Sequence, residues 1–178
     1  MYFYHYYENE LGPLKNLSTL SQKDAQEIQN NFYKQNNKYA SKRPTWYIER
    51  RFELEKIVRS EFIKKGGKPK TFYPHYFVVE KCDWLESWYH NPTEIKISSE
   101  KINKQYISFT YGDMFPTFSD IVNDGKEYRK KVYLYDEITE IITKYGLPQN
   151  WNPDGLLGPE RYIEVQIWLE SKEILELI

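Results

Sequence analysis

The stretch Tyr106–Phe118 constrains the fold most, because it joins a strand pattern to an unusually apolar loop. Apolar and hydroxyl-bearing residues alternate over Ile107–Tyr111, which predicts a strand with one buried face. Gly112 and Asp113 break this pattern, and apolar residues dominate the loop that follows. Such a loop must pack against the body of the protein, a ligand or a second subunit, since it would otherwise leave an apolar patch in water.

Size and composition indicate a globular protein. The chain has 178 residues, of which 40% are hydrophobic and 29% charged, and these values suit one domain with a full core. We expect a single domain over residues 1–178, with a helical part at about 13–67 and a strand-rich part at about 71–170. Tyrosine is the compositional outlier, with 17 copies. Tyrosine collects at interfaces and at sites for sugars or bases, although a core built from amphipathic rings explains it more simply.

The sequence predicts a cytoplasmic protein that does not span a membrane. Cys82 is the single cysteine, so an internal disulfide is excluded, and a buried structural thiol is its simplest role. The first residues lack the basic and apolar segments of a signal peptide. No window reaches the roughly 18 consecutive apolar residues that a transmembrane helix needs.

Charge is unevenly distributed along the chain. Lys42–Lys70 holds ten basic and four acidic residues, and Asp136–Ile178 holds three basic and nine acidic residues. A basic segment can contact phosphates. In the first segment, however, glutamates alternate with the basic residues at helical spacings, which favours a solvated, salt-bridged helix face. We therefore do not expect nucleic-acid binding.

Two helices are predicted in the N-terminal half. Ser21 and Asp24 suit the start of the first helix as cap and capping partner. Pro44 suits the first turn of a longer helix that ends at Gly66 and Gly67. Its apolar stripe comprises Tyr47, Leu54, Ile57, Val58 and Phe62.

Mostly strands are predicted elsewhere, so the fold class is α+β. We expect two N-terminal helices, then a largely antiparallel mixed sheet, with one further C-terminal helix capped by Asp136. The aromatic segment around Trp84 and Trp88 fits one or two helical turns or a loop. The predicted strands are Tyr2–Tyr7, Tyr76–Glu80, Glu94–Ile97, Tyr106–Tyr111, Lys131–Leu134 and Arg161–Trp168.

Common site motifs do not occur in the sequence. His5, His75 and His90 share no metal-binding spacing, and there is no pair of cysteines. The sequence also contains no G-x-G-x-x-G, P-loop or G-x-S-x-G motif. We therefore predict no metal site and no cofactor.

Glu164 is the most informative carboxylate. In the predicted strand it shares a face with Tyr162 and Trp168, while Ile163 and Val165 lie on a core face. A carboxylate among aromatic rings is partly desolvated, which raises its pKa and suits it to acid–base chemistry or to binding a sugar hydroxyl. The alternative is a hydrated outer face of an amphipathic strand.

Three short segments resemble the ADP-ribosyltransferase superfamily. They are YFYHYY at the N-terminus, ISFTY and RYIEVQIW, which supply His5, Tyr111 and Glu164. The resemblance implies that His5 would hold the nicotinamide ribose of NAD, Tyr111 would stack on nicotinamide and Glu164 would polarise a ribose hydroxyl. The phrases YGLPQ and GPERYIEVQIW also resemble uncharacterised bacterial and phage accessory proteins, which implies no activity.

Carboxylates around the central loop have two interpretations. Asp113, and Asp124 with Glu127, lie near a basic run and suit a phosphate or another polar substrate. Aspartate beside glycine is, however, typical of turns, because its side chain bonds its own backbone.

Two functional hypotheses remain from the sequence. The first is a binding or interaction module with an aromatic-rich site for a small planar or nucleotide-like ligand or a protein partner. The alternative is an ADP-ribosyltransferase-like enzyme that acts on NAD or a related nucleotide. A homodimer through the aromatic surface is compatible with both. The expected ligand-binding residues are Trp84, Trp88, Tyr89, Asp113, Phe115 and Trp151, with Tyr111 on the same surface.

Overall fold

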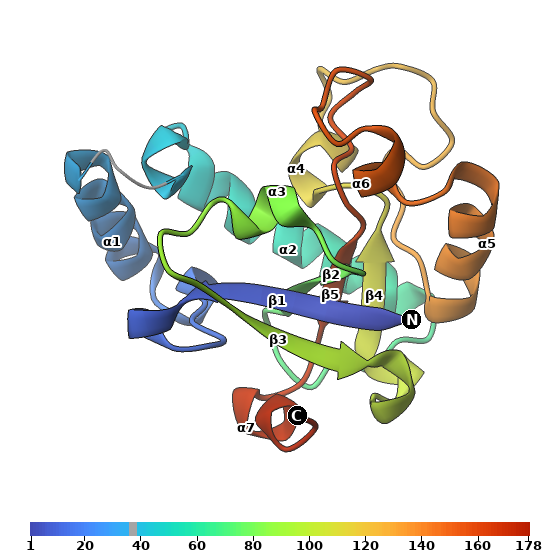
Figure 1. Cartoon of the computed structure of the whole chain (residues 1–178), viewed down its shortest axis with the longest axis horizontal. Helices are drawn as coiled ribbons and strands as arrows, with labels where there is room; N and C mark the ends of the chain where they lie inside the picture. The colour runs from blue at the N-terminus through green and yellow to red at the C-terminus, as the bar shows by residue number, and fades with distance from the viewer. Residues whose placement is uncertain (36–38) are drawn as a thin grey trace.

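A five-stranded antiparallel sheet organises the molecule. The computed structural model describes residues 1–35 and 39–178. The strand order is β3-β1-β2-β5-β4, and each neighbouring pair is antiparallel. In Figure 1, β1 and β3 run across the view while β4 and β5 run up and down it, so the sheet is strongly twisted. The strands are β1 (Tyr2–Glu8), β2 (His75–Val79), β3 (Pro92–Ser98), β4 (Ile107–Thr110) and β5 (Glu164–Ile167).

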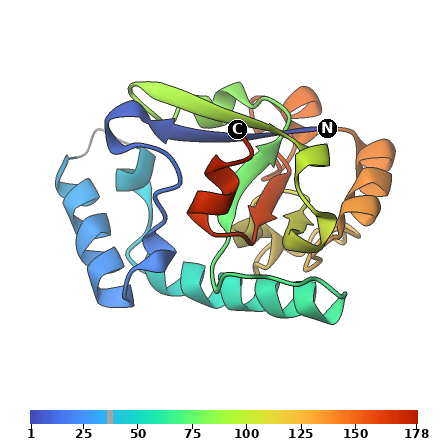
Figure 2. The ribbon, with the colours of Figure 1, turned by 90° about the horizontal axis from the view of Figure 1, so that it is seen from below.

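Helices cover both faces and the ends of this sheet. Figure 2 shows α2 along one side of the molecule, with α1 and α5 at opposite ends. Five short 3₁₀ turns also lie in the described residues, at 9–11, 17–19, 39–42, 99–101 and 104–106. The helices are α1 (Gln22–Gln35), α2 (Tyr47–Lys64), α3 (Asp83–Glu86), α4 (Met114–Thr117), α5 (Tyr135–Tyr145), α6 (Pro148–Trp151) and α7 (Ser171–Leu175).

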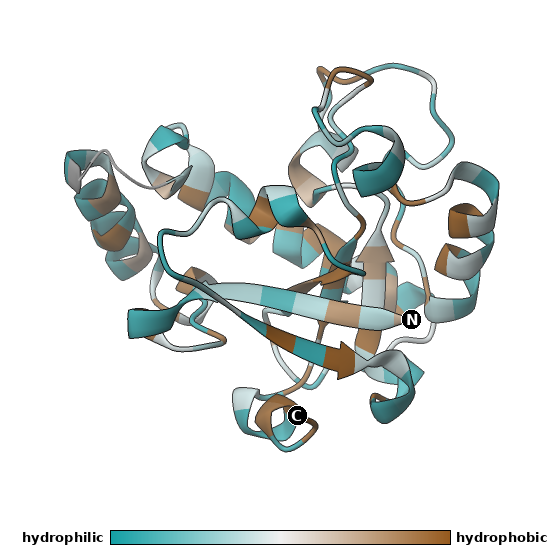
Figure 3. Cartoon of the chain, in the orientation of Figure 1, coloured by the Kyte–Doolittle hydropathy of each residue, from teal (hydrophilic) through white to brown (hydrophobic). Residues whose placement is uncertain are grey.

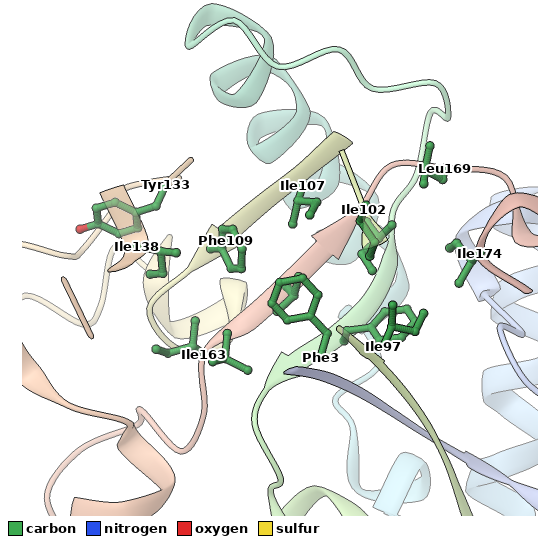
Figure 4. Close-up of a cluster of buried hydrophobic side chains, with 14 of the residues drawn as sticks. Phe3, Ile97, Ile102, Ile107, Phe109, Tyr133, Ile138, Ile163, Leu169 and Ile174 are labelled. Atoms are coloured by element: carbon green, nitrogen blue, oxygen red, sulfur yellow. The ribbon is translucent and has the colours of Figure 1, made fainter. Parts of the chain in front are cut away.

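One face of the sheet, the apolar face, carries the largest core cluster. Phe77, Val165 and Phe109 lie in one row across three strands, because each is paired with its neighbour in the register. With Phe3 they pack against Ile138 of α5 and the rest of this cluster (Figure 4). Directly paired residues of adjacent strands share a face, so the register fixes which side chains can meet here.

The opposite face, the polar face, is also buried. Val78, Glu164 and Thr110 form one row across it, and Tyr76, Gln166 and Ser108 form the next. Helix α2 covers this face through apolar side chains that pack with Trp168, which is fully buried. The α2 residues that pack in this cluster with Trp168 are Leu54, Val58 and Phe62. Ile57, which we expected in the same apolar stripe, is instead 38% exposed.

The structure confirms an α+β fold and corrects the order of its elements. The first element is β1, an inner strand of the sheet, and both N-terminal helices lie between β1 and β2 in the chain. The sheet is antiparallel rather than mixed over the described residues, and α5, α6 and α7 all follow β4. Of the helical part expected at 13–67, residues 36–38 lie outside the described residues.

Local sequence patterns correctly predicted the start of α1 but not the segment before α5. Ser21 caps α1 as expected, since its Oγ accepts from Asp24 N at 3.1 Å and donates to the Asp24 carboxylate at 2.7 Å. The predicted strand at Lys131–Leu134 is wrong: Tyr133 makes one isolated bridge with Phe109. The residues after that bridge enter α5, whose acidic Glu137 accepts from the backbone of Leu134 at 2.8 Å.

Candidate functional site

A hydrogen-bonded row of polar side chains crosses the polar face of the sheet. Trp168 Nε1 donates to Ser108 Oγ at 2.8 Å, and Ser108 Oγ donates to Gln166 Oε1 at 2.8 Å. Gln166 Nε2 then donates to Thr110 Oγ1 at 3.2 Å and to Glu164 Oε1 at 2.9 Å. This row orients the Glu164 carboxyl from one side only. Its second oxygen, Oε2, has no hydrogen-bond partner among the described residues.

A second group of polar side chains, from α2, packs against the polar face of the sheet. Glu55 is fully buried, and its Oε1 accepts from Ser18 Oγ, Arg51 Nε and Tyr76 Oη at 2.7, 3.0 and 2.5 Å. Its Oε2 is buried without a hydrogen-bond partner. The Arg51 guanidinium lies 4.8 Å from the centre of the Tyr76 ring and also donates to Tyr47 Oη at 3.0 Å. Charge pairing thus compensates for the burial of Glu55, yet half of its acceptor capacity is unused.

Asp113, at the start of α4, is a further carboxylate within electrostatic range of Glu164. Its Oδ1 accepts from the backbone of Phe115 at 2.7 Å as the helix cap, and its Oδ2 accepts from Tyr162 Oη at 2.8 Å. Burial raises the pKa of Glu164 well above its usual value, and the negative charge of Asp113 raises it further. Glu164 therefore favours the protonated form, which can donate as well as accept a hydrogen bond. We call Arg51, Glu55, Tyr76, Asp113, Tyr162 and Glu164 the acid–tyrosine cluster.

Aromatic rings from α3 and the 39–42 turn stand beside this cluster. Tyr39 stacks on Trp88 with ring centres 3.7 Å apart, and Trp84 meets Trp88 edge-on at 4.9 Å. Trp84 also lies 6.1 Å from Tyr162, which donates to Asp113. Burial raises the pKa of Tyr39, and the Asp113 carboxylate contributes to that shift. We call Tyr39, Trp84 and Trp88 the aromatic wall. The Asp113 carboxylate of the acid–tyrosine cluster is therefore close enough to act electrostatically on Tyr39 of this wall.

Arginines and two further rings border the same region. The Arg161 guanidinium lies 4.2 Å from the centre of the Trp84 ring, and the Arg43 guanidinium 4.3 Å from that of Tyr47. Tyr47 stacks on Phe115 with ring centres 5.0 Å apart. Both arginines are half-buried, and a guanidinium can combine ring stacking with binding of an anion such as phosphate.

Of the expected ligand-binding residues, the structure brings most together and separates one. Asp113 belongs to the acid–tyrosine cluster, and Trp84, Trp88 and Phe115 supply rings beside it. Tyr89, like Trp84, packs against the buried cluster that contains Tyr4, Val78 and Tyr162. Trp151 lies elsewhere, packed on the apolar-face cluster, with its Nε1 donating to Tyr111 Oη at 3.3 Å.

The three residues suggested by the ADP-ribosyltransferase resemblance do not meet. His5 packs on Phe77 of the apolar face with ring centres 5.1 Å apart, whereas Glu164 lies on the polar face. Tyr111 belongs to the apolar-face cluster, and its hydroxyl donates to the Gly146 carbonyl at 2.8 Å. The sheet itself separates His5 and Tyr111 from Glu164, so no His-Tyr-Glu site is formed. The activity implied by that resemblance stays a prediction.

His5 has a structural environment. Its Nε2 accepts from Leu14 N at 3.1 Å, which leaves the proton on Nδ1 to be donated to the Tyr76 carbonyl at 2.8 Å. Burial lowers the pKa of His5 below its usual value, consistent with a neutral ring. Both ring nitrogens are therefore used in holding the loop after β1 to the edge of β2.

The Asp124 and Glu127 side chains are engaged in surface ion pairs rather than gathered at the acid–tyrosine cluster. Asp124 pairs with Arg129, and Glu127 pairs with Lys144 at 2.7 Å. Buried Glu160 accepts from Lys126 at 3.1 Å and also pairs with Arg129. These contacts hold the 119–134 loop against the 152–161 loop, which explains them without a ligand.

Two shallow hollows lie outside the cluster. One, of about 460 Å³, is lined by Phe115 and by exposed Trp46 and Ile121. The other, of about 380 Å³, lies between α2 and the exposed Phe72. No group of three or more His, Cys, Asp or Glu that could hold a metal ion is found in residues 1–35 and 39–178.

Comparison with protein families, with curated proteins and with solved structures finds no match for this chain. Within the part of the chain that the structure describes, no helix has the length and apolar character needed to cross a membrane.

Sequence reasoning missed Arg51, Glu55 and Tyr39. A signal for Glu55 was present, because it lies between Leu54 and Val58 of the apolar stripe and four residues after Arg51, the spacing of a helical ion pair. Tyr39 carried no such signal, since its place beside Trp88 depends on how two distant segments pack.

Proposed function

We propose that this protein is a binding module for a small planar ligand that carries N–H donors on its edge, such as a nucleobase or a nucleotide. The observation that carries the proposal is the Glu164 carboxyl: it is buried at 6% exposure, held through one oxygen, and beside an aromatic wall. Buried polar atoms normally have at least one hydrogen-bond partner, and Glu164 Oε2 has none among the described residues. A donor-bearing ligand would complete the hydrogen bonding of this carboxyl.

The surroundings of Glu164 support a planar ligand. Tyr162 is in electrostatic range of the Glu164 carboxyl, and its ring centre lies 6.1 Å from that of Trp84. Stacking on such rings contributes about 1–3 kcal/mol per base. Asp113 adds negative charge on the same side, which favours a ligand with N–H groups over one with acceptors only. Arg43 and Arg161 at the border suit the phosphate of a nucleotide.

A thermal-shift panel of nucleobases, nucleosides, nucleotides, NAD and cyclic dinucleotides tests this proposal. A ligand at about 100 times its dissociation constant should stabilise the fold by roughly 2.7 kcal/mol. Glu164→Gln should weaken a true hit by about 0.5–1.5 kcal/mol, the usual net value of a hydrogen bond to a neutral group, because Glu164 favours its protonated form. Glu140→Gln, an exposed change on α5, should leave the affinity unchanged.

Two results would reject the proposal. One is the absence of any stabilising ligand across the panel. The other is a ligand whose affinity survives both Glu164→Gln and Trp84→Ala, since its site would then lie elsewhere. If NAD is the hit, assaying its turnover with wild type and Glu164→Ala would test the enzymatic alternative.

A protein partner is the second candidate, favoured by the hollow at α4. Trp46 is 56% exposed and Ile121 is 95% exposed, and both line it with Phe115. An apolar surface of this kind is typical of interaction sites. A photo-crosslinking residue at Ile121 should capture one defined partner in cells, whereas the same residue at exposed Glu140 should not; equal labelling at both positions would reject this candidate.

A further inference from the structure

The outer edge of β3 carries a charge pattern that is complementary to itself. β3 is the terminal strand of the sheet, and in the described residues no strand pairs with its outer side (Figure 1). Its inner side is fully paired with β1 over seven residues, from Pro92 opposite Glu8 to Ser98 opposite Tyr2. A strand of this length and regularity presents a row of free backbone donors and acceptors along its other side.

Charged and apolar residues alternate along this strand. Glu94 and Lys96 are exposed and lie on the polar face, while Ile95 and Ile97 are buried on the apolar face, an alternation that Figure 3 also shows. The Lys96 ammonium lies 4.1 Å from the centre of the Tyr2 ring and 5.5 Å from that of Tyr4, both on β1, and the residue is exposed. Glu94 makes no ion pair with the described residues.

We propose that β3 pairs with β3 of a second copy of this chain, antiparallel and centred on Ile95, so that two sheets join into one. In this register Glu94 of each copy lies opposite Lys96 of the other, which gives two symmetry-related pairs of opposite charge. Opposite charges directly across an antiparallel pair stabilise it, and like charges destabilise it. Such an isologous contact is what a two-fold dimer requires.

Charge also excludes the neighbouring registers. A two-fold axis through Glu94 would place that carboxylate opposite its own copy, and an axis through Lys96 would do the same for the ammonium. A register one residue away, with Glu94 opposite Ile95, is also excluded. It would place residues whose backbone N–H and C=O point to the outer edge opposite residues whose groups point to β1, so the hydrogen bonds between the two copies would be lost. A lysine in an edge strand ordinarily discourages association, and here it does so unless the facing strand offers a glutamate at the matching position.

Charge swapping tests the pairing, with sedimentation velocity over a wide concentration range as the measurement. Wild type should form a dimer. Glu94→Lys or Lys96→Glu alone should weaken the dimer roughly tenfold or more, because two attractive pairs become repulsive. The double variant E94K/K96E should restore the dimer, since each lysine again faces a glutamate.

Controls separate this interface from general charge effects. Glu140→Lys and Lys23→Glu alter net charge by the same amounts at exposed positions away from β3, and neither should change the dimer. Circular dichroism and thermal melting establish that every variant is folded. A monomeric wild type, or a dimer that both single swaps leave intact, would overturn the proposal. So would a double variant that is folded but no longer associates.

Discussion

The two faces of the sheet are built from the same strands but hold their candidate site residues differently. On the apolar face, both ring nitrogens of His5 and the hydroxyl of Tyr111 have partners, so these polar groups are structural. On the polar face, Glu55 Oε2 is buried without a partner, and Glu164 is held through Oε1 alone. The comparison teaches that a polar residue type indicates a site only when its bonding capacity is unused.

This difference changes which residues are the better candidates for a functional site. His5 and Tyr111 have chemistry suited to catalysis, yet their environment fixes them in place. Glu164 is buried, and it shares its environment with Asp113, whose charge opposes ionisation. A ligand would therefore meet the polar face, and the apolar face would hold the fold together.

The largest expected effect is on the apolar face. Phe109→Ala should lower the free energy of unfolding by about 3–5 kcal/mol, because it removes a fully buried ring that contacts Phe3. Chemical denaturation measures this loss. Tyr2→Ala, at an exposed position on β1, serves as the comparison and should cost far less. A loss below about 1 kcal/mol for Phe109→Ala would contradict the assignment of this face as the core.

The next effect concerns His5. His5→Ala should destabilise the fold by about 2–4 kcal/mol, because the Leu14 amide and the Tyr76 carbonyl lose a partner. The affinity of the folded protein for any ligand found above should not change, since His5 lies across the sheet from Glu164. Denaturation and a ligand titration at a temperature where the variant is folded give both values. Lost affinity with unchanged stability would instead support a catalytic or binding role.

The smallest effect is the most specific. The pKa of Glu164 is raised in the folded state, so its contribution to stability is present below the unfolded value of about 4.3 and is lost as pH rises through the folded pKa. Each unit by which the pKa is raised corresponds to about 1.4 kcal/mol. Glu164→Gln should remove this loss and make the protein relatively more stable at alkaline pH.

The difference between wild type and Glu164→Gln isolates this carboxyl. Burial lowers the pKa of both His5 and His75, that of His75 to about 4, and each therefore adds stability as pH rises. These opposing contributions cancel when the two proteins are compared at each pH by chemical denaturation. If the free energy of unfolding of wild type and of Glu164→Gln changed with pH in parallel, Glu164 would have the same pKa in the folded and unfolded states, which would contradict this prediction.

The sequence predicted local structure well where one element carried its own signal. Ser21 and Asp24 marked the start of α1, and the alternation at Glu94–Ile97 marked β3. The strand predicted at Lys131–Leu134 was wrong, because a run of β-branched and aromatic residues can equally form one isolated bridge, here between Tyr133 and Phe109, just before a helix. The placement of β1 inside the sheet could not be predicted, since strand order depends on long-range pairing.

The site was predictable only in part. Alternation around Glu164 correctly placed it with Tyr162 and apart from Val165, but sequence spacing cannot show that α2 buries this face as well. Matching His5 to Glu164 by residue type failed to bring them together because a strand sends consecutive side chains to opposite faces, and pairing register decides which faces coincide.

The ionisation of Glu164 tests the central claim most directly. Carboxyl ¹³C NMR of protein labelled at glutamate Cδ, with the signal assigned through Glu164→Gln, follows this group alone as pH changes. We expect Glu164 to titrate well above the usual range of a glutamate, as burial and Asp113 require, and a bound N–H-bearing ligand to lower that pKa. Titration in the ordinary range would show a hydrated surface carboxylate and would contradict the account of the polar face.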